Sequence, residues 1–282
     1  MITIDQYVWP ATVAEADALL HGRPDAAIIG GGVFTRLTSR HIGLAIDLSR
    51  AGLDGIRETD QSFEVGAMVT LRDLETDERL TRAHDGILTR ATGQISGVQL
   101  RNLATVGGTF YGRYAFSDLI TAFLALGCTV HLHRGGAMPV ADFLALSQQV
   151  SPAGRQSGKD ILTHLSVDKT ASRAACQSMR ITAGSLPILT VAAARGPSGV
   201  RIAIGARPGQ PVLASQTMAE LNRALTEHGL PTAADDLEHL AAQAARTAAA
   251  EVPFADDRRA TGAYRQLLCQ TLVKRTLLEV MA

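Results

Sequence analysis

Two glycine-rich segments are the parts of this sequence whose residue types and spacing best suit ligand binding. The first segment, IIGGGVFTR at 28–36, directly follows a short apolar run. Glycine adopts positive φ angles and lets backbone amides approach an anion, and successive amides of this kind form concave sites for phosphate oxygens. The segment therefore predicts a phosphate-binding loop, and the alternative is a tight turn between a strand and a helix.

The first segment differs from two common nucleotide-binding motifs. Thr35 stands where the pattern G-x-G-x-x-G, counted from Gly30 and Gly32, would need its last glycine. No Gly-Lys-Ser/Thr sequence follows, so the segment is not a P-loop. A phosphate site here would have to be built in another way.

The second segment has paired glycines in the order Thr105-Val106-Gly107-Gly108-Thr109. Its sequence alone does not distinguish a binding turn from a structural one. Two such turns in one domain could each face one phosphate of a pyrophosphate. Main-chain donors would suit this chain, because its 27 Lys and Arg residues only balance its 27 Asp and Glu residues.

The composition also argues against several classes of function. A net charge of zero leaves no positive surplus to neutralise nucleic-acid phosphates. Aromatic residues make up only 4% of the chain, which argues against base-stacking surfaces. The longest uncharged stretches, 119–132 and 181–194, are shorter than the roughly 20 residues that span a bilayer. We therefore expect no nucleic-acid partner and no membrane span.

The cysteines and histidines predict no metal site on this chain. Cys128, Cys176 and Cys269 are odd in number and far apart, so they do not form a disulfide framework and cannot hold a four-cysteine cluster. His131 and His133 would share one strand face without a third ligand. The N-terminal sequence MITIDQYVWP lacks the pattern of an export signal, and together with the cysteines it predicts a cytoplasmic location.

Hydrophobic periodicity predicts a mixture of strands and helices around these segments. Most strands precede residue 215 and long helices follow it, which favours an α+β chain whose C-terminal subdomain starts near residue 175. The segment 151–160 is rich in Gly, Ser and Pro and is predicted to be a loop. The predicted strands are 26–29, 44–48, 63–70, 129–133, 161–167, 188–194 and 199–205, and the predicted helices are 14–21, 71–80, a stretch before Ser96, Ser117 or Asp118 to Gly127, 216–228, 235–250 and the C-terminal segment.

The segment ISGVQLRNLATVGGT at 95–109, followed by Ser117-Asp118-Leu119 and the run AFLALGCTV, resembles a known family. It is similar to the FAD-binding subunits or domains of the xanthine dehydrogenase and carbon monoxide dehydrogenase family of molybdenum hydroxylases. The resemblance covers nearly the whole chain, and QLRNLATVGG is its most specific part. It also includes the first glycine segment and the stretches 66–75, 200–214 and 254–268.

The resemblance implies an α+β fold with FAD as the cofactor. A two-lobed FAD-binding domain of the molybdopterin dehydrogenase type (PCMH/VAO-like) would occupy 1–172, with lobes at about 1–55 and 56–172, and a small α+β flavoprotein subdomain would occupy 173–282. Both glycine turns would hold the FAD pyrophosphate. The implied cofactor-binding residues are Ile28, Ile29, Gly30, Gly31, Gly32, Val33, Phe34, Thr35, Ile95, Thr105, Val106, Gly107, Gly108, Thr109, Ser117, Asp118 and Leu162.

Three of these residues have more specific implied roles. By the resemblance, Asp118 matches an aspartate that contacts the dinucleotide at a sugar hydroxyl, while Ile95 and Leu162 stand where relatives place apolar residues against the cofactor. The residues alone leave Asp118 as a helix N-cap, because Ser and Asp side chains accept the unpaired amide hydrogens at a helix start. One carboxylate could fill both roles.

The resemblance also implies partners. An iron-sulfur small subunit would pass electrons through FAD to NAD, oxygen or a quinone, and a molybdenum-cofactor large subunit would oxidise the substrate. FAD would carry the redox chemistry, so no acid-base catalytic residue is expected on this chain.

Several departures from the family pattern leave alternatives open. Val33 and Phe34 replace polar residues, bulky side chains at 110–116 replace small ones, and the lysine that some relatives carry before Arg180 is missing. The alternatives are a stand-alone FAD-dependent oxidoreductase acting on a small molecule and a scaffold subunit that has lost FAD. The run Asp256-Asp257-Arg258-Arg259 is interpreted as local ion pairs, with a partner contact as the alternative.

Overall fold

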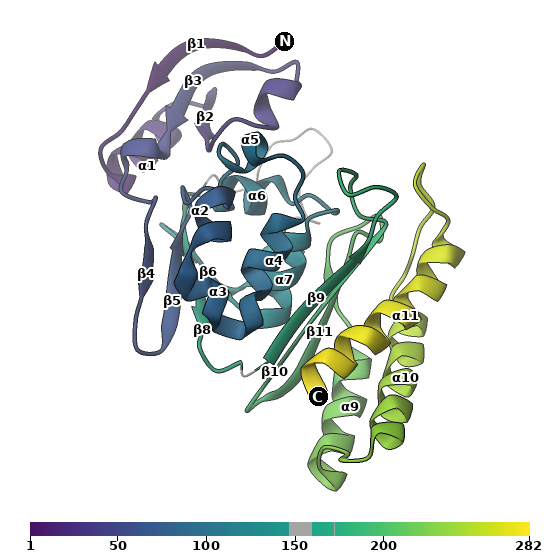
Figure 1. Ribbon diagram of the computed structural model, residues 1–282. Helices are drawn as coiled ribbons and strands as arrows, with labels where there is room; N and C mark the ends of the chain where they lie inside the picture. Colours follow the sequence, from purple (N-terminus) through teal and green to yellow (C-terminus); the bar gives the residue numbers. More distant parts are fainter. Residues whose placement is uncertain (147–159, 172) are drawn as a thin grey trace. The chain divides into compact units, whose positions relative to one another are not determined.

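The computed structural model describes residues 1–146, 160–171 and 173–282, which form two compact units (Figure 1). Unit 1 consists of Met1–Leu74, Gly97–Arg113 and Thr129–Val167. Unit 2 consists of Glu75–Ser96, Tyr114–Cys128 and Asp168–Ala282. The predicted loop at 151–160 lies outside the described residues except for Asp160. The predicted division between 172 and 173 stays a prediction, since the two units follow contacts rather than chain order.

Unit 1 begins with a three-stranded parallel sheet in the order β1-β3-β2. The helix between the first two strands starts after Thr12, whose side chain accepts a hydrogen bond from the Glu15 amide. Its Ala16 and Leu20 pack in one cluster with Leu44 of the central strand. The elements are β1 (Thr3–Val8), α1 (Val13–Gly22), β2 (Ala26–Ile29) and β3 (His41–Asp47), followed by the short 3-10 helix η2 (Leu48–Arg50).

A five-stranded sheet in the order β4-β5-β8-β6-β7 contains the other strands that the structure describes in unit 1. The predicted strand 63–70 is shorter than expected, because the chain turns after Gly66 and the Val69 amide donates to the Gly66 carbonyl. The elements are β4 (Ile56–Glu58), β5 (Ser62–Gly66), β6 (Thr129–Leu132), β7 (Gly136–Pro139) and β8 (Leu162–Asp168), with the 3-10 helix η1 (Thr35–Leu37) and the short helices α2 (Leu71–Thr76), α5 (Val98–Arg101), α6 (Val106–Gly112) and α8 (Val140–Leu146).

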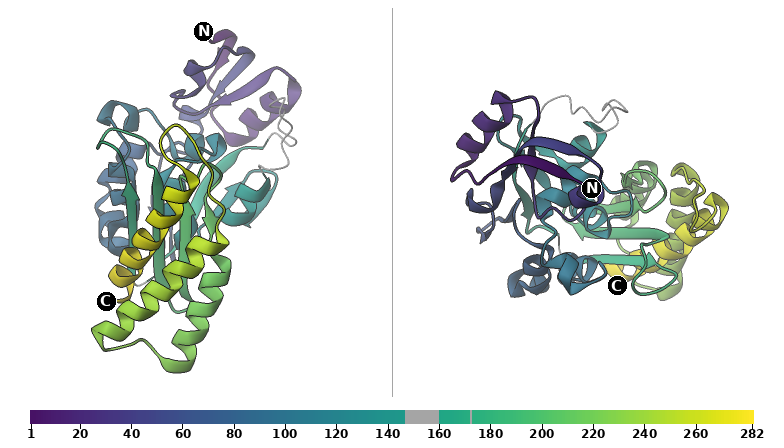
Figure 2. Two further views of the ribbon diagram at one scale, coloured as in Figure 1. Left: turned by 90° about the vertical axis from the view of Figure 1, so that its right-hand side faces the viewer. Right: turned by 90° about the horizontal axis from the view of Figure 1, so that it is seen from above.

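Unit 2 is built on an antiparallel sheet in the order β12-β11-β10-β9, with helices on both of its faces (Figures 1 and 2). The predicted helix 71–80 is two helices, because Asp77 accepts hydrogen bonds from the Arg79 and Leu80 amides and starts a new helix. The elements are α3 (Glu78–Arg82), η3 (Ala83–Gly86), α4 (Ile87–Gly93) and α7 (Asp118–Leu126), then β9 (Arg173–Met179), β10 (Leu189–Gly196), β11 (Gly199–Gly205), β12 (Val212–Leu213), α9 (Ser215–His228), α10 (Ala234–Glu251) and α11 (Gly262–Met281).

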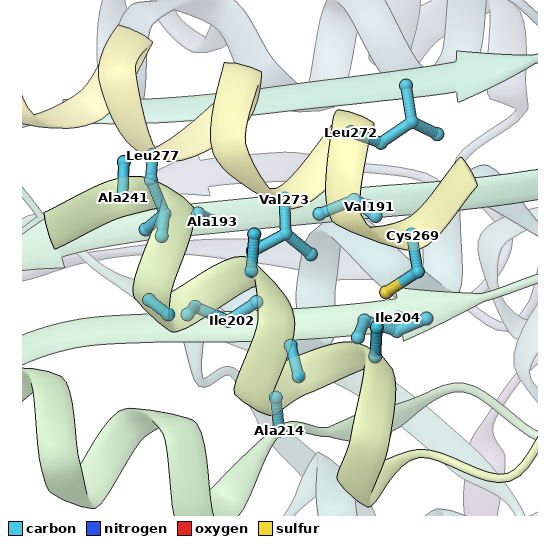
Figure 3. Packing of buried hydrophobic residues seen from close by; sticks show 14 of the residues in the cluster. Val191, Ala193, Ile202, Ile204, Ala214, Ala241, Cys269, Leu272, Val273 and Leu277 are labelled. Atoms are coloured by element: carbon cyan, nitrogen blue, oxygen red, sulfur yellow. The ribbon is translucent and has the colours of Figure 1, made fainter. Parts of the chain in front are cut away.

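An apolar cluster of unit 2 lies between this sheet and the C-terminal helices (Figure 3). Val191 of β10, Ile202 of β11 and Val273 of α11 are completely buried there. Burying one such side chain contributes about 1.5–3 kcal/mol, so this cluster stabilises the packing of the C-terminal helices on the sheet. Within the part of the chain that the structure describes, no helix is long and apolar enough to cross a membrane.

Candidate functional site

The first glycine segment forms the loop between β2 and η1 in unit 1. Ile28 and Ile29 end the strand, and Thr35 begins the 3-10 helix. Gly31 and Gly32 have φ angles of 63° and 67°, so two successive residues are left-handed. The Gly32 amide donates to the Gly30 carbonyl at 2.8 Å, which closes a very tight turn.

Gly31 has no room for a side chain. A Cβ atom there would overlap the carbonyl oxygen of Leu103, which is backbone and cannot rotate away. At Gly32 a Cβ atom would meet only the Cγ2 atom of Ile29, at 3.9 Å. Gly31 is therefore required by both space and backbone conformation, and Gly32 by conformation alone.

Several backbone donors of this loop are unused. Among the described residues, the amides of Gly31, Val33 and Thr35 have no hydrogen-bond partner. These three amides alternate along the loop with the Gly32 amide, which is used inside the turn. Backbone N–H groups of a turn can bind an anion. The loop therefore offers main-chain donors for a phosphate group without any side-chain charge.

The second glycine segment is the first turn of α6, a helix that the sequence pattern did not predict. The amides of its residues 106–109 are all used inside unit 1. The Val106 amide donates to the Val69 carbonyl at 2.9 Å, and the Gly107 amide donates to the Ala67 carbonyl at 2.7 Å. The Gly108 amide donates to the Thr105 hydroxyl at 3.1 Å, so Thr105 is the N-cap. The Thr109 amide donates to the Thr105 carbonyl at 2.9 Å.

The structure brings the two glycine segments into contact. A Cβ atom on Gly30 would lie 3.0 Å from the Thr105 Oγ1 atom, and one on Gly108 would lie 3.1 Å from the Gly30 carbonyl oxygen. A Cβ atom on Gly107 would lie 2.8 Å from the Ala67 carbonyl oxygen. The paired glycines therefore let the backbone of α6 lie directly against the first loop and the end of β5. That the two segments hold one ligand together stays a prediction.

The remaining predicted site residues are divided between the two units. Leu162 begins β8 in unit 1 and is 2% exposed. Ile95, Ser117 and Asp118 belong to unit 2. Ile95 is half-buried and follows α4, and its amide donates to the Thr92 carbonyl. Ser117 caps α7 by accepting a hydrogen bond from the Ile120 amide at 3.2 Å, as the sequence predicted.

Asp118 is not a helix cap, and this corrects the interpretation from the residues alone. It is the first residue of α7 and is 2% exposed. Its Oδ2 atom pairs with the Arg180 guanidinium, and its Oδ1 atom accepts a hydrogen bond from the Thr190 hydroxyl at 2.6 Å. Burial raises the pKa of the Asp118 carboxyl, while Arg180 and Thr190 act in the opposite direction.

Arg180 and Thr190 are site residues that the sequence analysis did not find as partners of Asp118. Arg180 also donates to the Ser185 carbonyl at 2.7 Å and to the Gln94 side-chain oxygen at 3.2 Å. By the resemblance, Arg180 matches an arginine of the family, and this match was the only sequence signal for it. Thr190 carried none, because it lies within an apolar strand.

The bulky side chains at 110–116 pack within their own units. Tyr111 donates to the Asp160 carbonyl at 2.5 Å and meets the Phe143 ring edge-on, with ring centroids 5.8 Å apart. Burial raises the pKa of Tyr111. The Arg113 guanidinium lies 4.6 Å from the Phe143 ring centroid. In unit 2, the rings of residues 114 and 116 stack with centroids 5.4 Å apart.

Within the described ranges, no group of three or more His, Cys, Asp or Glu side chains is arranged to hold a metal ion. His131 instead stacks on His164 with ring centroids 4.0 Å apart. The three cysteines are free thiols. Burial raises the pKa of Cys269 to about 12, so this thiol is protonated at neutral pH.

Two family models match the chain. The FAD binding domain in molybdopterin dehydrogenase matches residues 3–167, and the CO dehydrogenase flavoprotein C-terminal domain matches residues 174–280.

Curated relatives include subunits of three dehydrogenases. The chain is 28% identical over 180 residues to the nicotinate dehydrogenase FAD-subunit of Eubacterium barkeri, which covers 60% of each chain. It is 30% identical over 139 residues to the xanthine dehydrogenase FAD-binding subunit of Escherichia coli O157:H7, which covers 47% of each chain. It is 32% identical over 130 residues to the 6-hydroxypseudooxynicotine dehydrogenase complex subunit alpha of Paenarthrobacter nicotinovorans, which covers 44% of each chain. The matches thus span 44% to 60% of the relatives' own lengths.

Solved structures confirm the fold. Quinoline 2-oxidoreductase from Pseudomonas putida 86 has a TM-score of 0.82 at 20% identity, and the match covers 99% of this chain and 97% of that one. The Cu,Mo-CO dehydrogenase has a TM-score of 0.81 at 22% identity, and the match covers 100% of this chain and 99% of that one. The expected FAD-binding domain followed by a C-terminal subdomain is confirmed.

Proposed function

Since the chain belongs to the family of FAD-binding domains of molybdopterin dehydrogenases, we propose that it is the flavin subunit of a multi-subunit molybdenum hydroxylase. In this assembly, electrons pass from iron-sulfur clusters on a small partner subunit through the flavin to NAD, oxygen or a quinone. A large partner subunit with the molybdenum cofactor oxidises the substrate. When bound, FAD supplies the redox chemistry, and the residues of this chain bind and orient it. A cytoplasmic location stays a prediction.

The first glycine loop is the observation that carries this proposal. The unpartnered amides of Gly31, Val33 and Thr35 are suited to bind one phosphate of the FAD pyrophosphate. The close approach of Leu103 to Gly31 holds the loop in this conformation. The apolar Val33 and Phe34 do not weaken the site, because the donors are main-chain groups.

The second glycine segment supports the first loop in this proposal. The amides of Val106, Gly107 and Gly108 already have partners, so their contribution is position rather than hydrogen bonds to the ligand. The absence of a side chain on Gly108 leaves room for the Gly30 carbonyl, and the absence of one on Gly107 lets α6 lie against Ala67. The phosphate site thus depends on the fit between two backbone segments.

Asp118 is the proposed contact for a sugar hydroxyl of FAD. A carboxylate has about four acceptor positions. Arg180 and Thr190 each donate to one oxygen of Asp118 and leave acceptor capacity on both. Ile95 and Leu162 are the proposed apolar contacts to the cofactor.

The bulky residues that motivated a stand-alone oxidoreductase have structural partners within their units. Tyr111 and Arg113 both contact Phe143, and Tyr111 also binds the Asp160 carbonyl. These contacts explain their size without a separate substrate site. We therefore prefer the flavin subunit as the function.

The proposal is tested by adding FAD to the purified chain and by isolating the tagged chain from its native host. We expect a bound flavin spectrum at one FAD per chain and two further subunits, one with iron-sulfur clusters and one with molybdenum. A folded chain that binds no FAD even in excess would contradict the proposal. A flavin-loaded chain that is isolated alone and oxidises a small molecule would favour the stand-alone oxidoreductase.

A further inference from the structure

The charged run before α11 forms part of a buried network in unit 2. Arg265, in the first turns of α11, is completely buried. Its guanidinium donates to the carbonyls of Ile188 at 3.0 Å, Ala255 at 2.6 Å and Ala260 at 2.7 Å. It also pairs with the Asp257 Oδ1 atom at 2.6 Å. Buried arginines are rare unless they are paired, and each of the three guanidinium nitrogens of Arg265 has a hydrogen-bond partner.

Asp257 connects this arginine to the rest of the run. Its Oδ2 atom pairs with the Arg259 guanidinium at 2.6 Å. Its Oδ1 atom accepts hydrogen bonds from the amides of Arg259 at 2.8 Å and Ala260 at 3.2 Å. Burial acts to raise the pKa of the Asp257 carboxyl, but the hydrogen bonds from Arg259 and Arg265 hold this pKa well below its usual range. The local ion pairs predicted for the run 256–259 are therefore confirmed at Asp257 and Arg259, whose pair belongs to a larger cluster.

Two contacts of this cluster lie on the segment between β9 and β10. Arg259 donates to the Pro187 carbonyl at 3.3 Å, and Arg265 donates to the Ile188 carbonyl at 3.0 Å. This segment starts with Arg180, and Thr190 follows Ile188 by two residues. Arg180 and Thr190 are the two residues that hold the Asp118 carboxyl. The charged cluster and Asp118 are thus connected through one short stretch of backbone.

We propose that Asp257, Arg259 and Arg265 are positioning residues for the flavin site. They fix the backbone at Pro187 and Ile188, so that Arg180 and Thr190 keep the Asp118 carboxyl in the orientation that FAD requires. This inference rests on the proposed contact between Asp118 and FAD.

The physical reason is that the hydrogen bonds at Asp118 tolerate only a small displacement of their donors. The Thr190 hydroxyl lies 2.6 Å from the carboxyl oxygen. A binding group must be held within about 0.5 Å of its productive geometry by such supporting contacts. A backbone shift of that size at Ile188 would reach Thr190 and lengthen the hydrogen bond. If the cluster served stability alone, its loss would lower the melting temperature and would not affect FAD binding through Asp118.

The experiment measures the Kd for FAD and the melting temperature of Arg259→Gln, with binding measured far below the melting temperature. This variant removes the pairing with Asp257 and the Pro187 contact, and it leaves the buried Arg265 in place. We expect FAD binding to become about fivefold to tenfold weaker, as for the loss of roughly one hydrogen bond. Arg259→Lys keeps the charge that pairs with Asp257 and should recover part of the affinity.

Glu251→Gln is the matched control. Glu251 accepts hydrogen bonds from the Gln216 amide at 2.8 Å and from the Thr217 amide and hydroxyl at 3.1 Å and 2.6 Å. It therefore holds another helix start of unit 2 and has no contact with the segment 180–190 among the interactions described. This variant should lower the melting temperature and leave the Kd for FAD unchanged.

A double-variant cycle separates positioning from a general loss of structure. In an Asp118→Asn background, Arg259→Gln should no longer weaken FAD binding, because residues that act through one contact are not additive. Two outcomes would overturn the inference and leave the proposed function intact. The first is that the losses of FAD affinity from Arg259→Gln and Asp118→Asn add up in the double variant. The second is that Arg259→Gln leaves the Kd for FAD unchanged while Asp118→Asn weakens binding. A folded Asp118→Asn variant with normal FAD affinity would overturn the proposed Asp118 contact and this inference with it.

Discussion

The two glycine segments of unit 1 look alike in sequence, but their backbones do different things. In the loop after β2, Gly31 and Gly32 are left-handed, and amides next to them have no partner among the described residues. In the first turn of α6, Gly107 and Gly108 have ordinary helical backbone, and their amides are bonded to Ala67 and Thr105. The first segment presents donors, and the second packs tightly against it.

This difference separates two reasons for glycine in one site. A change in the first loop should act mainly on ligand affinity, since it disturbs donors that the fold does not use. A change in α6 should act mainly on stability, since its glycines lie against backbone atoms of Ala67 and Gly30. Affinity and melting temperature together therefore distinguish the two segments.

The largest effect on FAD is expected for Gly31→Ala. The new Cβ atom overlaps the Leu103 carbonyl, and the left-handed backbone adds about 1–2 kcal/mol of strain. If two of the three proposed hydrogen bonds to the phosphate are lost, each worth about 1.5–3 kcal/mol, FAD binding should weaken by more than about 100-fold. Flavin absorbance of the purified variant measures this. Gly52→Ala is the control, because Gly52 is also left-handed, with φ of 70°, but has no atom within 4 Å of its Cβ position.

Gly107→Val should mainly destabilise unit 1. Its Cβ atom would lie 2.8 Å from the Ala67 carbonyl oxygen and 2.9 Å from the Ala67 Cβ atom. Overpacking of this kind costs about 1–3 kcal/mol or more, and FAD should be lost as α6 moves. Thermal unfolding and flavin retention are measured on the same sample. A variant with the wild-type melting temperature that has lost FAD would show that Gly107 contacts the ligand directly.

Gly32→Ala should weaken FAD binding about tenfold while stability falls by only about 1–2 kcal/mol. The Cβ atom has room at 3.9 Å from Ile29, so the effect comes from the left-handed φ alone. The same measurements on Gly52→Ala show how much stability the left-handed φ alone removes at a position outside the loop. Equal FAD affinity in the two variants would show that the loop does not bind the phosphate.

Thr105→Val should have the smallest effect. It removes the hydroxyl that accepts the Gly108 amide and caps α6, which costs about 1 kcal/mol of stability. FAD affinity should change less than about twofold, because the Gly108 amide is not a ligand donor in this account. Denaturant unfolding and FAD titration measure the two quantities. A large loss of affinity would assign the second segment a direct role in binding.

The sequence predicted best those elements whose pattern is local. The strands β2 and β11 have their predicted bounds, because each is a short apolar run between glycines or turns. The bounds of the strand β1 could not be predicted, because it is exposed along almost all of its length and shows no alternation. The helix α6 was missed because a glycine pair in its first turn lowers its helix propensity.

The candidate site was predictable where the backbone requires glycine. The run of glycines after an apolar segment marked the first loop, and the structure explains why Gly31 must be glycine, because no other residue fits its conformation beside Leu103. The partners of Asp118 were not, because Arg180 and Thr190 follow it by 62 and 72 residues and no local pattern connects them. The burial of Arg265 was missed for the same reason, since its partners come from several separate segments.

Binding of the FAD pyrophosphate by the first loop is tested by comparing FAD with riboflavin, which has no phosphate groups, on the wild-type chain and on Gly32→Ala. Fluorescence titration gives the Kd of each ligand. If the first loop binds the pyrophosphate, Gly32→Ala weakens FAD binding about tenfold and leaves riboflavin binding unchanged. An equal loss for both ligands, or no loss for FAD, would contradict the account.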